Sequence, residues 1–175
     1  MTAVDDTPQN RNFLSPLNYQ FQIKRSPNLN FFLQKVNIPS ITLPEYQAPN
    51  PFVTIPTSHT NVDFGQLDIT FKVDEDLQNY MELYYWIIKL GFPSEFAQYK
   101  SIAQNPVYTG TGIESDISLV VLDSAKNPNY EIVFHNAIPI SLGEIIFDST
   151  YGDVDYVTAS ASFKYILFEV NKITN

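Results

Sequence analysis

The side chains that could carry out chemistry are few and do not cluster in the sequence. His59 and His135 are the only histidines, and neither has a pattern of metal ligands beside it. Because the chain has no cysteine, thiolate zinc sites, iron–sulfur clusters and cysteine nucleophiles are excluded. A G-x-S-x-G nucleophile elbow is also absent from the sequence. We expect both imidazoles to be structural or exposed.

Carboxylates are plentiful, but local structure accounts for their grouping. The DED run at 74–76 is typical of a helix start, where acids lie at the positive end of the helix dipole. Asp148, Asp153 and Asp155 share one connecting loop and could in principle bind Ca²⁺, but the EF-hand spacing is absent, so a turn is favoured. The glycine pair in TGTG at 109–112 lacks the lysine and the strand-to-helix context of a phosphate loop. We therefore predict no enzyme activity, no cofactor and no metal site.

The composition limits the classes of partner. The chain has 175 residues, enough for one domain of ordinary size, and 44% of them are apolar, so it can bury a sizeable core. Ten basic residues against nineteen acidic ones give a net charge of −9, which leaves no cationic surplus for tracking DNA phosphates. Residues 1–12 are too polar for a signal peptide, and the longest apolar stretch, 80–92, is too short to cross a bilayer. We expect a soluble protein.

The elements that position these side chains begin with strands. Residues 1–14 are predicted to form a flexible arm, and residues 15–175 a single β domain. Apolar and polar residues alternate over 19–24, which predicts a strand. A turn at 26–28 and extended chain over 31–36 would complete a hairpin.

A long proline-rich loop is predicted over residues 37–65. It holds five of the chain's twelve prolines, which bar it from a central strand or a helix interior. It is nevertheless rich in apolar residues, so it must either fold back on its own domain or cover a neighbour. The apolar residues of the loop are Ile38, Ile41, Leu43, Tyr46, Phe52, Val53 and Ile55.

A clear strand and the only expected long helix follow. Strict alternation over 66–73 predicts a strand with one apolar and one polar face. An apolar stripe at helical spacing predicts a helix over about 75–90, ended by Gly91 and Pro93. The stripe, which we expect to pack on the core, consists of Leu77, Tyr80, Met81, Tyr84 and Ile88.

The second half of the chain is predicted to be β-hairpins. Alternation over 117–121 and 130–134 flanks turn residues and predicts one hairpin. A second hairpin would join 143–147 to a long final strand over 156–170, which is long enough to cross a sheet corner or run beyond its domain. The stretch over 94–114 looks irregular. The predicted fold is mainly β, a two-sheet antiparallel sandwich or partly closed barrel with one α-helix.

Several strings occur in a fixed order along the chain: SPLNYQF at 15–21, FLQKVNIP at 32–39, DFGQLDITF at 63–71, VDED at 73–76, Trp86, LGFP at 90–93 and PISLG at 139–143. In this order and spacing they resemble the tail tube proteins of contractile-tailed, T4-like bacteriophages. The resemblance covers residues 15 to 170, and residues 1–14 and 94–114 depart from it.

This resemblance implies a structural virion protein found in the tail and assembled in the host cytoplasm. Such subunits form hexameric rings stacked into a tube, with sheath, baseplate and tail-terminator proteins as partners. Strands of six subunits join into an inner barrel, an extended loop reaches a neighbouring subunit, and DNA passes through the lumen without sequence-specific binding. The acidic net charge fits a conduit, because like charges keep DNA from adhering to the wall.

Residue roles follow from combining the resemblance with the strand pattern. Inter-ring contacts are expected at Tyr46, Phe52, Val53 and Ile55. The polar faces of the two alternating strands are candidates to line the lumen, although they could equally face bulk solvent. These candidates are Gln66, Asp68, Thr70, Lys72, Thr158, Ser160, Ser162 and Lys164.

Two alternatives stay open at this point. One is a paralogue of the same fold that initiates the tube at the baseplate or terminates it. The other is a carbohydrate-binding β-sandwich, in which eleven tyrosines and one tryptophan could stack on sugars. The position of Trp86 in the helix register favours packing over sugar stacking.

Overall fold

The computed structural model describes residues 11–48, 52–53, 55–58, 61–91, 96–103, 112–148, 150 and 156–173. Three helices and eleven strands lie in these ranges. The helices are α1 (Pro27–Phe32), α2 (Gln78–Gly91) and α3 (Phe96–Ala103). The strands are β1 (Tyr19–Ile23), β2 (Leu33–Val36), β3 (Ile41–Thr42), β4 (Glu45–Ala48), β5 (Ile55–Ser58), β6 (Asp63–Phe64), β7 (Leu67–Lys72), β8 (Ser115–Leu122), β9 (Pro128–Leu142), β10 (Thr158–Lys164) and β11 (Leu167–Lys172).

Two antiparallel sheets form the body of the domain and share strand β9. Sheet A has the order β1-β8-β9-β11, and sheet B has the order β9-β10-β7-β2. The first ten residues of β9 pair with β8, whereas residues 138–142 pair with β10. The predicted mainly-β, two-sheet antiparallel fold is confirmed, and the described strands close no barrel.

The chain passes from one sheet to the other at two points. In β9 the bend lies at Asn136, whose φ of 55° is left-handed, a region that asparagine tolerates better than most residues. The Asn136 backbone N–H donates to Asp116 on β8 at 3.1 Å, which holds the bend. The predicted long final strand turns its own corner after Lys164, so that β10 belongs to sheet B and β11 to sheet A. The expected sheet corner is confirmed.

The core lies between the sheets, where the apolar faces of their strands meet. Alternation along β7 and β10 places Leu67, Ile69 and Phe71 beside Ala161 and Phe163, all fully buried or nearly so. Helix α2 closes one end of the core with Leu83 and Trp86. The residues buried from sheet A include Phe21, Ile23, Ile117, Leu119, Ile132 and Phe134.

The helices differ from the sequence-based expectation in two ways. The predicted turn at 26–28 begins α1, because proline is favoured in the first turn of a helix, and β2 then pairs with β7, so no hairpin forms with β1. The stretch over 94–114, expected to be irregular, contains α3. The prediction of a single helix is therefore wrong. None of the helices in the described ranges is long and apolar enough to span a membrane.

The face of α2 that packs on the core is also rotated from the predicted stripe. Its buried residues are Asn79, Leu83 and Trp86, whereas Tyr84 of the predicted stripe is 42% exposed. Asn79 is buried because its side chain satisfies the backbone, donating to the Lys72 carbonyl at 2.7 Å and accepting from the Asp74 N–H at 3.4 Å.

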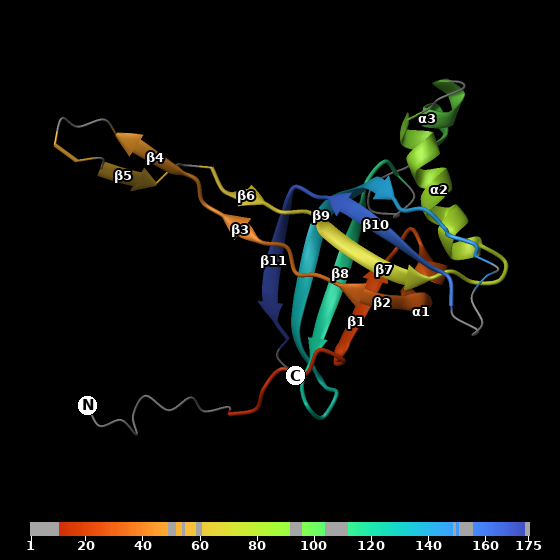
Figure 1. Ribbon diagram of the computed structural model, residues 1–175, viewed down its shortest axis with the longest axis horizontal. Helices are drawn as coiled ribbons and strands as arrows, with labels where there is room; N and C mark the ends of the chain where they lie inside the picture. The colour runs from red at the N-terminus through yellow and green to blue at the C-terminus, as the bar shows by residue number, and fades with distance from the viewer. Residues whose placement is uncertain are drawn as a thin grey trace.

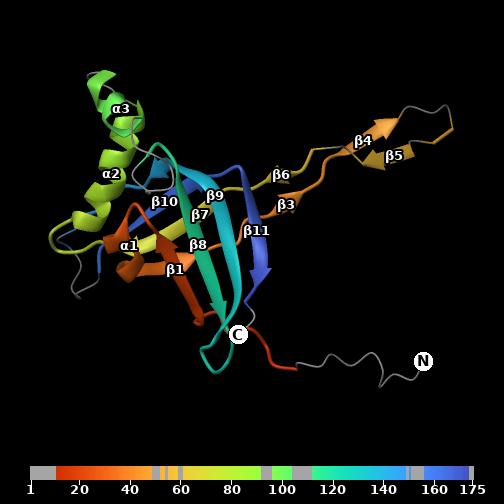
Figure 2. The same ribbon diagram turned by 180° about the vertical axis from the view of Figure 1, so that it is seen from behind.

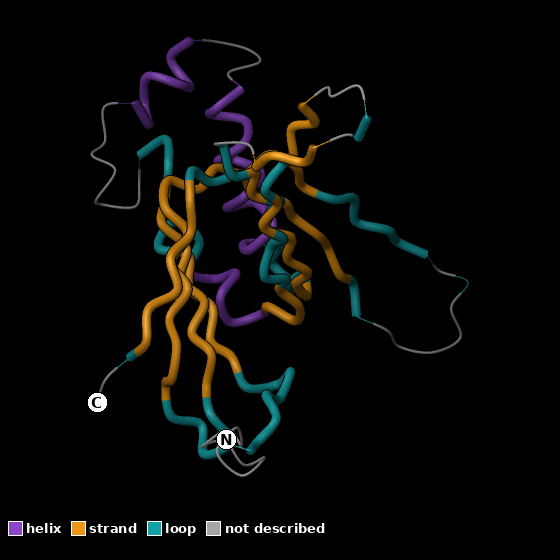
Figure 3. The backbone as a smooth tube through the Cα atoms, turned by 90° about the vertical axis from the view of Figure 1, so that its left-hand side faces the viewer, coloured by secondary structure: helices purple, strands orange, loops and turns teal. Residues whose placement is uncertain are grey.

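The proline-rich loop projects away from the sandwich as a long arm (Figure 1). Figure 2 shows from behind that α1, the end of β7 and the start of β10 lie on the opposite side of the domain from this arm. Helices α2 and α3 lie toward the end of the sandwich opposite to the turn between β8 and β9 (Figure 3). The loop therefore does not fold back on its own domain in the parts of it that the structure describes.

Candidate assembly surfaces

The arm, residues 37–65, is a narrow ribbon of two short antiparallel ladders. Strand β3 pairs with β6 near the body, and β4 pairs with β5 farther out. Pro56 lies in β5 opposite Gln47, a place that proline can occupy because each strand of a two-stranded ribbon has a free edge. The prediction that prolines exclude this region from a central strand holds, and the arm gains edge pairing that was not foreseen.

The root of the arm is fixed to the body. The Asn37 side chain accepts from the Asp68 N–H at 2.6 Å and donates to the Gln66 carbonyl at 3.3 Å, so it joins β2 to β7. The Gly65 N–H donates to the Ser40 carbonyl at 2.9 Å, and a Cβ at Gly65 would lie only 3.0 Å from the Ser40 hydroxyl. Glycine permits this close approach of the two chains.

An aromatic cluster continues the root into the core. Phe64 of β6 contacts Tyr165 and Phe168, with ring centroids 6.2 and 5.6 Å apart. Both of those rings also contact buried Phe134 of sheet A. Burial raises the pKa of the Tyr165 phenol. The arm therefore begins at a packed corner of the sandwich, so its direction is set by the body.

Beyond its root the arm carries apolar side chains into water. Phe52 is 96% exposed, and Val53 beside it is also largely exposed. Tyr46 and Ile55 lie on the paired strands β4 and β5, but their side chains lie outside the described ones. Of the four predicted contact residues, the structure thus places two as exposed and locates the backbone of the other two. The arm's other exposed apolar residues are Ile38, Ile41, Leu43 and Val62.

A polar face covers the outer side of sheet B. The register pairs Thr158 with Lys72, Ser160 with Thr70 and Ser162 with Asp68 across β10 and β7. Gln66 and Lys164 extend the face toward the arm, and both are exposed. The eight predicted lumen candidates thus share one face, and the structure alone does not say what that face meets.

Hydrogen bonds and a contact between a lysine and an aromatic ring hold some of the side chains on this face in place. The Ser162 hydroxyl donates to Asp68 at 2.7 Å, and Lys164 Nζ donates to the Phe64 carbonyl at 3.3 Å. Lys72 Nζ lies 3.7 Å from the centroid of the Tyr156 ring. Lys35 of β2 lies beside Thr70 and is exposed. The face is therefore a mixture of hydroxyls and lysines rather than an acidic wall.

Both edges of sheet B lack a partner strand within the described chain. Strand β2 pairs only with β7. Strand β9 beyond Ala137 pairs only with β10, because its ladder with β8 ends at the Ser115–Ala137 pair. Unpaired N–H and C=O groups at such edges are ready to pair with another chain.

Within the described part of the chain, no three histidine or carboxylate side chains gather in a way that could hold a metal ion. His135 Nδ1 lies 4.0 Å from Asp116, and its Nε2 lies 3.8 Å from Glu169. Because the two carboxylates approach opposite nitrogens of the ring, one ion could not bind all three groups. His135 is half-exposed, in agreement with the expected structural or exposed imidazole, whereas His59 lies outside the described residues.

Trp86 is 1% exposed, so it offers no stacking platform to a sugar. Its indole N–H donates to the Ile113 carbonyl at 3.0 Å, and the Arg25 guanidinium lies 4.8 Å from its ring centroid. Burial lowers the pKa of Arg25. The packing role expected for Trp86 is confirmed.

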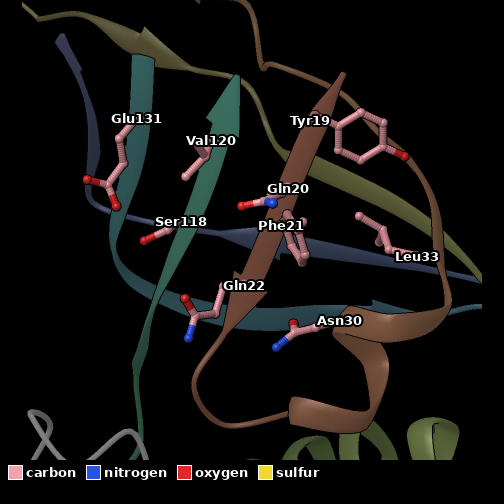
Figure 4. Close-up of a pocket in the computed structure, with 9 residues that line it drawn as sticks. All are labelled: Tyr19, Gln20, Phe21, Gln22, Asn30, Leu33, Ser118, Val120 and Glu131. Atoms are coloured by element: carbon pink, nitrogen blue, oxygen red, sulfur yellow. The ribbon is translucent and has the colours of Figure 1, made fainter. Parts of the chain in front are cut away.

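A shallow hollow of about 470 Å³ lies over β1 on sheet A. Figure 4 shows Gln20, Gln22 and Ser118 on its floor and Asn30 at its rim. Amides and hydroxyls with the single carboxylate of Glu131 provide hydrogen bonds, but no nucleophile and base paired for catalysis.

Comparison with known proteins gives structural matches only. No protein-family model matches the sequence. No curated protein matches it either.

Solved structures with chains of similar fold include three determined by cryo-EM. One is the cap that terminates the tube of the anti-feeding prophage, with a TM-score of 0.61 at 12% identity over 99% of this chain and 100% of that one. A second is the sheath/tube terminator of the PVC extracellular contractile injection system, with a TM-score of 0.60 at 13% identity over 93% and 99%. A third is the anti-feeding prophage baseplate, with a TM-score of 0.55 at 12% identity over 87% and 90%.

These matches cover between 87% and 99% of this chain and between 90% and 100% of the other chains. The neighbours are components of structural assemblies. At such low identity, the likeness concerns the fold. The protein shares its fold with chains in these cap, terminator and baseplate structures.

Proposed function

We propose that this chain is a structural subunit of a phage-like contractile tail, and that it assembles into hexameric rings stacked into a tube. The observation that carries the proposal is the arm, which leaves a packed corner of the body and carries exposed apolar side chains away from it. A subunit in isolation leaves this surface in water, which is unfavourable by about 25 cal/mol for each Å². The fold likeness to a tube cap and a tube terminator supports the same role.

Rings would close through sheet B. Its two free edges, β2 on one side and the second half of β9 on the other, would pair between neighbouring subunits. A closed barrel removes every edge, and with it the hazard of pairing with other chains. We propose that this barrel is the inner wall, with the polar face of sheet B toward the lumen.

The charged side chains on that face change the expectation that an acidic wall repels DNA. The face carries Lys35, Lys72 and Lys164 against the single Asp68, so the acidic excess of the chain lies elsewhere. Repulsion of DNA by an acidic wall therefore finds no support in this face. Passage of DNA through the lumen remains part of the proposal, with the lysines attracting phosphates and the hydroxyl groups offering weaker contacts to phosphates and water.

The tube would be part of a virion tail built in the host cytoplasm, with the sheath, baseplate and tail-terminator proteins as partners. The runner-up within this class is a subunit that initiates or terminates the tube, which the likeness to a baseplate chain and a tube cap supports equally. An initiator or terminator forms one closed ring, whereas a tube subunit stacks without limit. A sugar-binding module has less support, because Trp86 is buried.

The arm is tested by placing charges at its tip. The double variant Phe52→Asp/Ile55→Asp is expected to remain folded and to lose stacking, because carboxylates cannot be buried against a neighbour without a large desolvation cost. Negative-stain electron microscopy gives tube length, and circular dichroism checks the fold. The matched control is Phe13→Asp, since Phe13 is 97% exposed but lies outside the arm. Tubes of unchanged length in the double variant would refute this role of the arm.

A further inference from the structure

A second apolar patch lies at the end of sheet B that is opposite to the arm. We call it the far-end patch, and it consists of Phe31, Ile146, Phe147 and Tyr156. Phe147 is 79% exposed, and the other three are also largely exposed. The sequence pattern places these residues in predicted extended chain, over 31–36, 143–147 and 156–170, but does not mark them as a contact surface.

The strands of sheet B place these residues together along one end. Phe31 lies at the end of α1, just before β2 begins at Leu33, and Tyr156 lies just before β10. Ile146 and Phe147 follow the end of β9, and the Tyr80 hydroxyl of α2 donates to the Gly143 carbonyl in the same connection. The four strands span about 14 Å at the usual spacing, so the patch is a band of that order.

The arm leaves sheet B from the other end of the same strands. It begins where β2 ends and returns where β7 begins, whereas α1, the end of β7 and the start of β10 lie on the opposite side (Figures 1 and 2). With the strands of sheet B along the stacking axis, head-to-tail copies would bring the arm of one copy to the far end of sheet B in the next. Two different surfaces at opposite ends are what an open-ended stack requires.

The chemistry of the two surfaces matches. Residues 37–65 contain no lysine or arginine and only two acids, Glu45 and Asp63. Phe52 and Val53, between β4 and β5, are exposed apolar groups. Glu144 and Asp148 are also exposed on either side of Ile146 and Phe147, and Lys72 Nζ lies over the Tyr156 ring. The apolar match is therefore between Phe52 and Val53 of the arm and Ile146 and Phe147 of the far-end patch.

We propose that the far-end patch is the docking site for the arm of a second copy of this chain. Phe52 and Val53 of one copy pack against Ile146 and Phe147 of the copy in the adjacent ring. This inference rests on the stacking in the proposed function and adds the surface that receives the arm.

Cysteine cross-linking tests the contact directly, because the natural chain contains no cysteine. The double variant Phe52→Cys/Phe147→Cys is assembled and then oxidised, and it is expected to give a ladder of covalent multimers on a denaturing gel. Such bonding requires the two Cα atoms to lie within about 7 Å. The matched control, Phe52→Cys/Phe13→Cys, is expected to remain monomeric on the gel. Equal ladders in both variants, or none in either, would overturn the inference.

Mixing two defective ring types gives a second test. Phe52→Asp rings retain the far-end patch, and Phe147→Asp rings retain the arm, so each alone is expected to form only single rings. Their mixture is expected to form pairs of rings and nothing longer, because only one competent junction remains. Tubes formed by Phe147→Asp alone would overturn the inference while leaving ring stacking intact. If the unmodified chain formed no rings at all, the proposed function would fail with it.

Discussion

Two phenylalanines in opposite environments should separate the stability of the subunit from its assembly. Phe163 is fully buried between the sheets, and its ring centroid lies 6.1 Å from that of Trp86. Phe52 is almost fully exposed at the arm. Each is changed to alanine in a separate variant.

The expected magnitudes follow from this burial. A buried phenylalanine hides about 200 Å² of surface, and Phe→Ala in a core typically lowers the free energy of unfolding by 3–5 kcal/mol. Phe163→Ala should therefore lose about 4 kcal/mol, a large part of the 5–15 kcal/mol that is usual for a domain. Phe52→Ala should change the free energy of unfolding by less than about 0.5 kcal/mol.

The assay is urea unfolding followed by tryptophan fluorescence, at a protein concentration below that of assembly. Trp86 packs beside Phe163 and reports on the core. With a slope of about 2 kcal/mol per molar urea, Phe163→Ala should lower the midpoint by about 2 M. Light scattering at high concentration should rank the two variants the other way round for assembly, with Phe52→Ala the one that is impaired in stacking. A loss above about 2 kcal/mol in unassembled Phe52→Ala would refute the reasoning, because the arm would then pack on its own body.

Two further predictions concern the sheet and a partly buried carboxyl group. Gly143→Ala should lower the free energy of unfolding by about 1–3 kcal/mol, because its Cβ would meet the Ser160 hydroxyl and lie 3.1 Å from the Ser160 carbonyl oxygen; an unchanged urea midpoint would contradict it. Burial raises the pKa of Glu82, whose Oε1 accepts from Asn28 at 2.8 Å. The native carboxyl then keeps its proton to higher pH than the unfolded one, so this group lowers stability as the pH rises above about 4. Glu82→Gln should thus be more stable than the parent at pH 7, by less than about 1 kcal/mol because Glu82 is only partly buried, and the gain should vanish in urea titrations at pH 3.5.

The strands of the body could be predicted because their pattern has a period of two. Alternation along β7 and β10 identifies both the buried and the polar residues, since a half-buried strand admits only one arrangement. The polar face of sheet B was therefore predictable residue by residue. The surface that this face contacts could not be predicted, because alternation identifies the residues that share a face but not what that face meets.

The helices were harder to predict, for physical reasons that particular residues show. Asn79 is polar, yet it is buried because it satisfies two backbone groups, so a hydrophobic pattern assigns it to the wrong face. Tyr84 counts as an apolar residue in the pattern, although tyrosine tolerates exposure. The predicted stripe is therefore placed away from Leu83 and Trp86, which are the residues that are buried. The sequence around Pro27 indicates a turn, although proline is also favoured in the first turn of a helix.

The central claim, ring formation followed by open-ended stacking, is tested most directly by negative-stain electron microscopy of the purified chain over a concentration series. The account predicts rings that stack into hollow tubes whose length increases with concentration, without added ligand. Discrete rings that never stack would assign the chain to the initiator or terminator role. A protein that stays monomeric at every concentration would contradict the account.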